Sequence, residues 1–126
     1  MSRRTITKDG NRAAGQPKRE TSSHVERIAR SLRPVLRKHA VCKAILFGSF
    51  ARGEQTRHSD IDLILVKRTD RRFLDRYEGL LRDLNNAVED SWVEPLIYTP
   101  EELAAMEGRP FIARALAEGV CIYEQE

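Results

Sequence analysis

The sequence has few residues that could cross-link or anchor a fold. Only two of its 126 residues are cysteines, Cys42 and Cys121, and both have apolar neighbours. Two cysteines without adjacent histidines cannot supply the four ligands of a structural zinc ion, so we expect reduced, buried thiols. No apolar run approaches the roughly 18 residues that cross a bilayer, and none follows Arg3 and Arg4 as a secretory signal requires. We therefore expect a cytoplasmic protein that makes no membrane contact.

Aromatic residues are also scarce, at 6%, whereas 40% of the residues are hydrophobic and 33% are charged. This composition and length predict one small folded domain. The net charge of +3 comes from residues 1–20, which carry six basic and two acidic side chains against 16 and 17 in the remainder. We interpret residues 1–20 as a disordered basic tail and 21–126 as the domain. The tail could contact nucleic acid, but only weakly, because no aromatic residue accompanies its charges.

The domain is expected to begin with a helix over residues 23–39. Ser23 and Glu26 have the spacing of a capping box, and apolar residues follow at helical intervals. Pro34 could bend this helix.

Strands and helices follow in a mixed order. Apolar runs predict strands over 41–47 and 59–66, the second of them in the middle of a sheet because both of its faces are partly apolar. A short helix is expected from Ser49, and one apolar face predicts a covering helix over 70–90.

The last third of the chain continues this pattern. A strand is expected over 92–98, where Pro95 indicates an edge position or a bulge. Thr99, the proline after it and the two glutamates that follow predict a capped helix that ends by Gly108. A helix over 110–118 and a strand over 120–123 are expected next. The fold class is therefore α/β (α+β), with helices packed on a small mixed sheet of three or four strands.

A phosphate-binding element is predicted where the first strand ends. Gly48 lets a phosphate approach the backbone, Ser49 offers a hydroxyl, and the first N–H groups of the short helix point outward. Gly53 would end that helix. Arg52 and Arg57 are close in sequence and could contact phosphates, or could form surface ion pairs.

Two aspartates in the next strand indicate a cation site. Asp60 and Asp62 are two residues apart and so project from one face of the strand, where two like charges need compensation. Carboxylate oxygens without histidine or cysteine suit Mg²⁺ or Mn²⁺. The alternative is that Asp60 caps a turn and Asp62 pairs with an arginine such as Arg52 or Arg57.

Glu94 is the candidate for a third acid. It lies in the third strand between apolar residues, where a carboxylate is unsuited to a core. It could complete a two-metal site and accept the proton of an attacking hydroxyl, or it could point into solvent from an edge strand.

These motifs resemble a known family. The stretch Gly48–Leu63 resembles the signature of the nucleotidyltransferase superfamily related to polymerase beta, in its MNT-type (minimal nucleotidyltransferase) branch. The runs Val93–Ile97 and Glu118–Tyr123 are also similar to this branch, so that the likeness covers most of residues 23–124.

The resemblance implies Mg²⁺-dependent transfer of a nucleoside monophosphate, AMP from ATP, to a hydroxyl. It implies that Gly48 and Ser49 hold the triphosphate and that Asp60, Asp62 and Glu94 bind two metal ions, although the family usually has Asp at the third position. It also implies a helical HEPN-type partner in a toxin–antitoxin pair, which could carry the acceptor. The alternative hypothesis is a catalytically degenerate nucleotide-binding module of the same fold.

Overall fold

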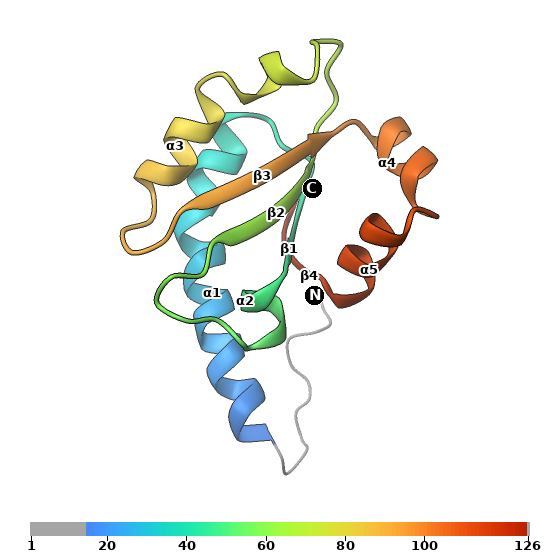
Figure 1. The fold of residues 1–126 in the computed structure, drawn as a ribbon. Helices are drawn as coiled ribbons and strands as arrows, with labels where there is room; N and C mark the ends of the chain where they lie inside the picture. The colour runs from blue at the N-terminus through green and yellow to red at the C-terminus, as the bar shows by residue number, and fades with distance from the viewer. Residues whose placement is uncertain (1–14, 126) are drawn as a thin grey trace.

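The computed structural model describes residues 15–125 as a four-stranded sheet in the order β3-β2-β1-β4, with helices on both faces (Figure 1). The strands are β1 (Lys43–Phe47), β2 (Ile61–Val66), β3 (Val93–Tyr98) and β4 (Val120–Glu124). β1 is antiparallel to both of its neighbours, whereas β2 and β3 are parallel. The predicted α+β class is confirmed, as are the interior position of β2 and the edge position of β3.

Helices pack on both faces of this sheet, and each face has its own apolar cluster. The helices are α1 (Gly15–Lys38), α2 (Ser49–Arg52), the 3-10 helix η1 (Leu74–Tyr77), α3 (Leu80–Asn86), α4 (Pro100–Met106) and α5 (Pro110–Glu118). The larger cluster joins α1 and α3 to one face of the sheet. The smaller one joins Ile45 and Ile64 of the sheet to Ile112 and Ala115 of α5 on the other face.

α1 begins earlier than the sequence analysis expects. It starts at Gly15, so that Ser23 and Glu26 lie inside the helix and do not form its N-terminal cap. Residues 15–20, which we assigned to the tail, therefore have helical backbone; residues 1–14 and 126 lie outside the described part of the chain. Extending a helix that is already packed is easier than nucleating one, which explains how α1 continues beyond its apolar stretch.

The end of α1 has a left-handed residue that is not glycine. Val41 N–H donates to the Leu36 carbonyl at 3.0 Å and Ala40 N–H to the Arg37 carbonyl at 3.1 Å, which is the Schellman pattern. Ala40 has a φ of 58°, a conformation that an alanine side chain disfavours. The packing of α1 therefore stabilises a turn whose backbone conformation is unfavourable for Ala40.

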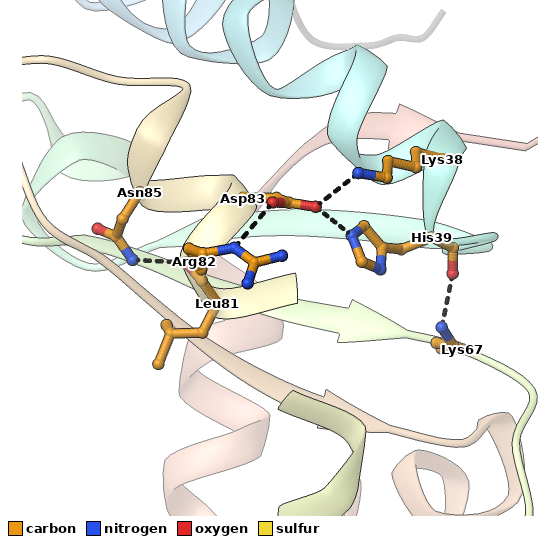
Figure 2. Close-up of polar contacts among 7 residues, drawn as sticks. All are labelled: Lys38, His39, Lys67, Leu81, Arg82, Asp83 and Asn85. Atoms are coloured by element: carbon orange, nitrogen blue, oxygen red, sulfur yellow. Dashed lines mark hydrogen bonds and ion pairs between the residues drawn. The ribbon is translucent and has the colours of Figure 1, made fainter. Parts of the chain in front are cut away.

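Asp83 connects α3 to the end of α1. Lys38 Nζ donates to Asp83 Oδ2 at 3.0 Å, and His39 Nε2 lies 2.8 Å from the same oxygen (Figure 2). Lys67 Nζ, just after β2, donates to the His39 carbonyl at 2.6 Å. The hydrogen bonds from His39 and then Lys38 hold the pKa of the Asp83 carboxyl well below its usual value. These contacts lie at the end of the sheet where β2 finishes.

The single helix expected over residues 70–90 is wrong. The structure has two shorter elements, η1 and α3, separated by Gly79 with a φ of 75°. A residue in the left-handed region cannot continue a right-handed helix, so the apolar periodicity persists across a break in the backbone.

Arg76 of η1 fastens this segment to the rest of the domain. Its side chain is buried, with a relative exposure of 7% for the residue. Nη1 and Nη2 donate to the two carboxylate oxygens of Glu102 at 2.7 and 2.9 Å, and Nη1 also donates to the Ile97 carbonyl at 3.1 Å. Glu102 completes the capping box that Thr99 opens at the start of α4, as the sequence predicts. One guanidinium thus joins η1, β3 and α4.

The expectation of two buried thiols is wrong. Cys42 is half-buried and Cys121 is exposed, and neither is in a disulfide. Cys121 lies on the edge strand β4, where it alternates with the buried Ile122 and so points away from the core. Within residues 15–125, no helix is both long and apolar enough to cross a membrane.

Candidate functional site

Three acidic side chains meet where β2 and β3 begin. Asp62 is the second residue of β2, and the strand register places it beside Glu94 on β3 and Phe47 on β1. Because residues in register on neighbouring strands share a face, with the strands about 4.8 Å apart, the carboxylates of Asp62 and Glu94 are neighbours. Asp60 lies just before β2, two residues from Asp62, and is near enough for its charge to raise the pKa of the Asp62 carboxyl. The sheet therefore brings together all three acids that the sequence analysis selects.

Gly48 lies against the central acid. It has φ 79° and ψ −155°, and a Cβ placed on it would come within 2.5 Å of Asp62 Oδ2. Only glycine populates that backbone region readily, and only a residue without a side chain leaves room for the carboxylate. The backbone at the end of β1 is therefore exposed to whatever Asp62 binds.

The charge of this cluster is uncompensated. Burial raises the pKa of the Asp62 carboxyl, and the charges of Glu94 and then Asp60 raise it further. Arg52 acts in the opposite direction, but its guanidinium donates to Glu54 at 2.9 Å and to Glu118 at 3.1 Å. Among the described residues, no ion pair or hydrogen bond reaches any of the three carboxylates. A bound cation would relieve the repulsion among these carboxylates.

The acids have the chemistry of a magnesium site, although they do not surround an ion-sized space. In the part of the chain that the structure describes, no three His, Cys, Asp or Glu side chains form a group that could hold a metal. Asp60 and Glu94 are exposed and Asp62 is half-buried, so the outer two can change rotamer without moving the strands. Three carboxylates with no nitrogen or sulfur donor fit Mg²⁺ or Mn²⁺.

Of the predicted phosphate-binding residues, Gly48, Ser49 and Arg52 lie near Asp62, whereas Arg57 does not. Ser49 follows Gly48 as the first residue of α2, no side chain caps that helix, and Gly53 ends it in the left-handed conformation, as predicted. Arg52 is close enough to lower the pKa of Asp62. Arg57 is not brought to the acids: it lines a pocket of about 1030 Å³ on the other side of β2.

That pocket lies between α1 and the loops before β2 and β3. It is lined in part by Phe50 and Ile61, which belong to the cluster on the α1 face of the sheet. Because the acids lie on the opposite face, a phosphate contact for Arg57 requires movement of its loop. His58 lines the same pocket.

Sequence reasoning overlooked Asn85. Its Oδ1 accepts from Val93 N–H at 2.6 Å, and its Nδ2 donates to the Val93 carbonyl at 3.2 Å and to the Leu81 carbonyl at 3.0 Å (Figure 2 shows the last of these). The Asn85 amide thus makes the two backbone hydrogen bonds that a neighbouring strand would make to Val93 at the open edge of β3. Val93 is the residue before Glu94. The only signal in the sequence is that Asn85 lies within an amphipathic helix. Asparagines are common on the exposed faces of such helices, so this signal does not indicate the bond to β3.

A comparison with known protein families identifies the family of this chain. The family described as polymerase beta, nucleotidyltransferase matches residues 30–126. This match covers most of the chain and includes every acid of the site. The chain therefore belongs to the polymerase beta-type nucleotidyltransferase family.

Curated relatives come from Methanocaldococcus jannaschii. "Putative protein adenylyltransferase MJ1305" is 32% identical over 88 residues, which cover 65% of this chain and 58% of that protein. "Putative protein adenylyltransferase MJ0435" is 45% identical over 42 residues, or 33% of this chain and 45% of that protein. The chain thus spans about half the length of the curated relatives it matches.

Solved structures share the fold at lower identity. A toxin–antitoxin complex with AMP-PNP has a TM-score of 0.57 at 22% identity, covering 78% of this chain and 74% of that one. A "putative nucleotidyltransferase from Sulfolobus solfataricus" has a TM-score of 0.55 at 16% identity, covering 91% and 94%. A tri-AMPylated Shewanella oneidensis HEPN toxin in complex with MNT antitoxin has 0.51 at 17%, covering 80% and 73%.

Proposed function

We propose that this protein transfers AMP from ATP to a hydroxyl group on a partner protein, in a reaction that depends on Mg²⁺. The observation that carries the proposal is the uncompensated cluster of Asp60, Asp62 and Glu94 beside Gly48. Three neighbouring carboxylates that no hydrogen bond or ion pair of the described residues reaches lower the stability of a fold unless they bind something. Proteins keep such clusters where a ligand supplies the missing charge.

Each residue has a definite task in this reaction. Asp60, Asp62 and Glu94 would hold Mg²⁺, which would supply positive charge to the phosphates and lower the pKa of the attacking hydroxyl. Gly48 and Ser49 bind the triphosphate at the end of β1. The acceptor oxygen forms a bond to the α-phosphorus as the bond from that phosphorus to the pyrophosphate oxygen breaks. Glu94 accepts the hydroxyl proton, and pyrophosphate leaves.

Arg52 can contribute to triphosphate binding. Its guanidinium is exposed and held by two carboxylates at the surface, each contact being a weak, solvent-screened ion pair. A triphosphate carries more charge than either Glu54 or Glu118 and can replace them. This exchange would remove Arg52 from α5 when ATP binds.

The choice of ATP and of a protein acceptor rests on the relatives. The curated relatives are named as protein adenylyltransferases, and one similar structure contains AMP-PNP. Another pairs an MNT antitoxin with a tri-AMPylated HEPN toxin. We infer that this chain acts in the same way on a helical HEPN-type partner in the cytoplasm.

Labelled transfer tests this proposal. The protein is incubated with α-labelled ATP, CTP, GTP or UTP and with Mg²⁺ or Mn²⁺ in an extract of its own cells. We expect one labelled protein band with ATP, lost in Asp62→Asn, which removes charge while preserving shape. Asp70→Asn is the matched control, because Asp70 is an exposed aspartate beyond the other end of β2.

The same variants separate transfer from binding. Calorimetric titration with Mg²⁺ and AMP-PNP should show binding that Asp62→Asn abolishes. Binding without any labelled band would identify a degenerate nucleotide-binding module, and Glu94→Asp should then restore transfer if the longer side chain is the cause. Absence of both binding and labelling would overturn the proposed function.

A further inference from the structure

The pocket that Arg57 lines has no part in the proposed reaction. Its volume is about 1030 Å³, and its walls are α1, the loop before β2 and the loop before β3. The acidic cluster lies on the opposite face of the sheet. Clefts of about 300–1,000 Å³ hold most small ligands, so this pocket has room for a molecule of that class.

One buried oxygen in the wall of this pocket lacks a hydrogen-bond partner. Gln55 lines the pocket, and its Oε1 is the one buried side-chain oxygen or nitrogen without a partner among the side chains that the structure describes. The residue as a whole is half-buried, so a rotation of its amide can turn this oxygen toward the pocket. A ligand with an N–H group would supply the missing hydrogen bond.

Two walls of the pocket have cationic side chains. Arg27 lies on α1, and Arg57 lies on the loop before β2. Arg57 has no hydrogen bond or ion pair with any residue that the structure describes, and Arg27 donates only to His24 Nδ1, at 2.6 Å. Neither guanidinium therefore has a carboxylate partner. Guanidinium groups bind phosphate oxygens through paired N–H donors, so a phosphate between these two walls would contact both.

Two histidines add donors to the same walls. Because a guanidinium can only donate, His24 Nδ1 accepts from Arg27, and the neutral His24 ring carries its proton on Nε2. His58 lines the wall that contains Arg57, and its ring has no partner in the described part of the chain. The donors on these walls therefore outnumber the acceptors, which favours an anionic group between them.

The third wall is acidic. Glu89 and Asp90 lie on the loop before β3, and neither forms an ion pair with the described arginines of the other walls. The two signs of charge are thus held apart across the pocket. A simple anion would gain from two walls and be repelled by the third. A ligand with N–H groups at the end remote from its anion would hydrogen-bond to the third wall as well.

The floor of the pocket is apolar. It consists of side chains from α1, α2 and the start of β2, each no more than 8% exposed: Ile28, Phe50 and Ile61. A ligand that spans the pocket from the basic walls to the acidic wall therefore crosses an apolar surface. Its middle part should be a body with little charge.

We propose that this pocket binds a nucleoside monophosphate, with the phosphate between Arg27 and Arg57 and the N–H groups of the base toward Gln55 and Asp90. The two arginines supply the charge that the phosphate needs, so binding requires no metal ion. Arg57 reaches this phosphate without any movement of its loop. The inference goes beyond the proposed function and does not depend on it, because it uses none of the residues of the acidic cluster.

Calorimetric titration in the presence of EDTA tests this pocket. The probes are AMP, ribose 5-phosphate and adenosine, which separate the contribution of the phosphate from that of the base. We expect AMP to bind and each of the two fragments to bind at least about tenfold more weakly, because each lacks one set of hydrogen bonds. Asp62→Asn should leave the affinity for AMP unchanged.

Variants of the pocket give the matched comparison. Arg57→Gln should weaken AMP binding at least about tenfold, because charge-assisted hydrogen bonds to the phosphate are lost. Arg68→Gln is the control, since Arg68 is also exposed but lies just beyond the other end of β2 and does not line the pocket. Gln55→Leu should weaken AMP binding and raise the urea midpoint of the free protein, because it removes an unpaired buried acceptor.

The outcomes separate this pocket from the acidic cluster. AMP binding that needs Mg²⁺ or is lost in Asp62→Asn would place the nucleotide at the acids and overturn the inference. Ribose 5-phosphate that binds as tightly as AMP would show an anion site without base contacts, which also overturns it. Absence of AMP binding in EDTA would overturn it as well, while Asp62-dependent binding of AMP-PNP with Mg²⁺ in the same preparation would leave the proposed function standing.

Discussion

Replacing Gly48 with alanine should damage both stability and nucleotide binding. The new Cβ would lie 2.5 Å from Asp62 Oδ2, well inside the closest approach of real side chains. The backbone at residue 48, with φ 79° and ψ −155°, is also a conformation that alanine rarely adopts. The protein must therefore either strain the turn after β1 or move the Asp62 carboxylate.

The size of the effect follows from these two contributions. Holding a residue other than glycine in that backbone region costs about 1–3 kcal/mol, and forcing an extra carbon into packed surroundings costs about 1–3 kcal/mol. We expect Gly48→Ala to lower the free energy of unfolding by about 3 kcal/mol in total. With a urea m-value of about 1.5 kcal/mol per M, the midpoint would fall by about 2 M.

Two other glycines provide matched controls. At Gly119, a Cβ would meet Ile45 Cγ2 at 2.5 Å and the Ala115 carbonyl at 2.7 Å, whereas at Gly108 it would meet nothing within 4 Å. Gly119→Ala should therefore destabilise the fold while its folded fraction binds Mg²⁺ and ATP normally. Gly108→Ala should change the free energy of unfolding by no more than about 0.5 kcal/mol.

Urea unfolding followed by circular dichroism, together with calorimetric titration of ATP and Mg²⁺, would measure both effects. Gly48→Ala should lose stability and binding, Gly119→Ala should lose stability alone, and Gly108→Ala should lose neither. Unfolding of Gly48→Ala at the same urea concentration as Gly108→Ala would show that neither the backbone conformation of Gly48 nor its contact with Asp62 opposes a side chain. Wild-type affinity for ATP in Gly48→Ala would equally contradict the close contact with Asp62.

Three further outcomes are expected. Ala40→Gly should raise the free energy of unfolding by about 1 kcal/mol in urea titrations, because glycine adopts a φ of 58° without strain. The hydrogen bonds between Glu102 and Arg76 lower the pKa of the Glu102 carboxyl from 4.5 to about 2. The stabilisation that this carboxylate gives the fold is therefore complete above pH 4.5 and is lost as the pH falls toward 2. Thermal unfolding of Glu102→Gln, measured across this range, should lack that part of the acid dependence. Asn85→Ala leaves Val93 without its amide partner and should destabilise by about 1–2 kcal/mol, with faster hydrogen exchange at Val93 than in the wild type.

Elements whose boundaries depend on local chemistry could be predicted from the sequence. The capping box at Thr99 and the glycine at 53 are decided by hydrogen bonds within a few residues, and both are present as expected. The edge position of β3 followed from Pro95, which cannot donate to a second strand. Glu94 was selected as the third acid because a carboxylate between apolar strand residues is unsuited to a core, but the sequence left open whether it points into solvent.

Features that depend on distant contacts could not be predicted. The break at Gly79 leaves the apolar period intact, so periodicity alone cannot distinguish it from a continuous helix. Arg57 is closer than Arg52 to the aspartates in sequence, yet Arg52 approaches Asp62 and Arg57 lines a pocket on the opposite face. That difference is set by the path of the loop over residues 54–60, for which the sequence has no periodic signal.

The strand register also has a consequence for the order in which the site assembles. Phe47 and Asp62 are neighbours across an antiparallel pair closed by a short connection, whereas Asp62 and Glu94 are joined through the whole segment between β2 and β3. Closing the longer segment loses more chain entropy and is slower. Contact order therefore predicts that the contact between Gly48 and Asp62 forms first and that Glu94 joins the site later. During refolding, a chain in which only β1 and β2 have paired would have Gly48, Asp60 and Asp62 in place but not Glu94. Nucleotide binding should therefore appear before nucleotide transfer.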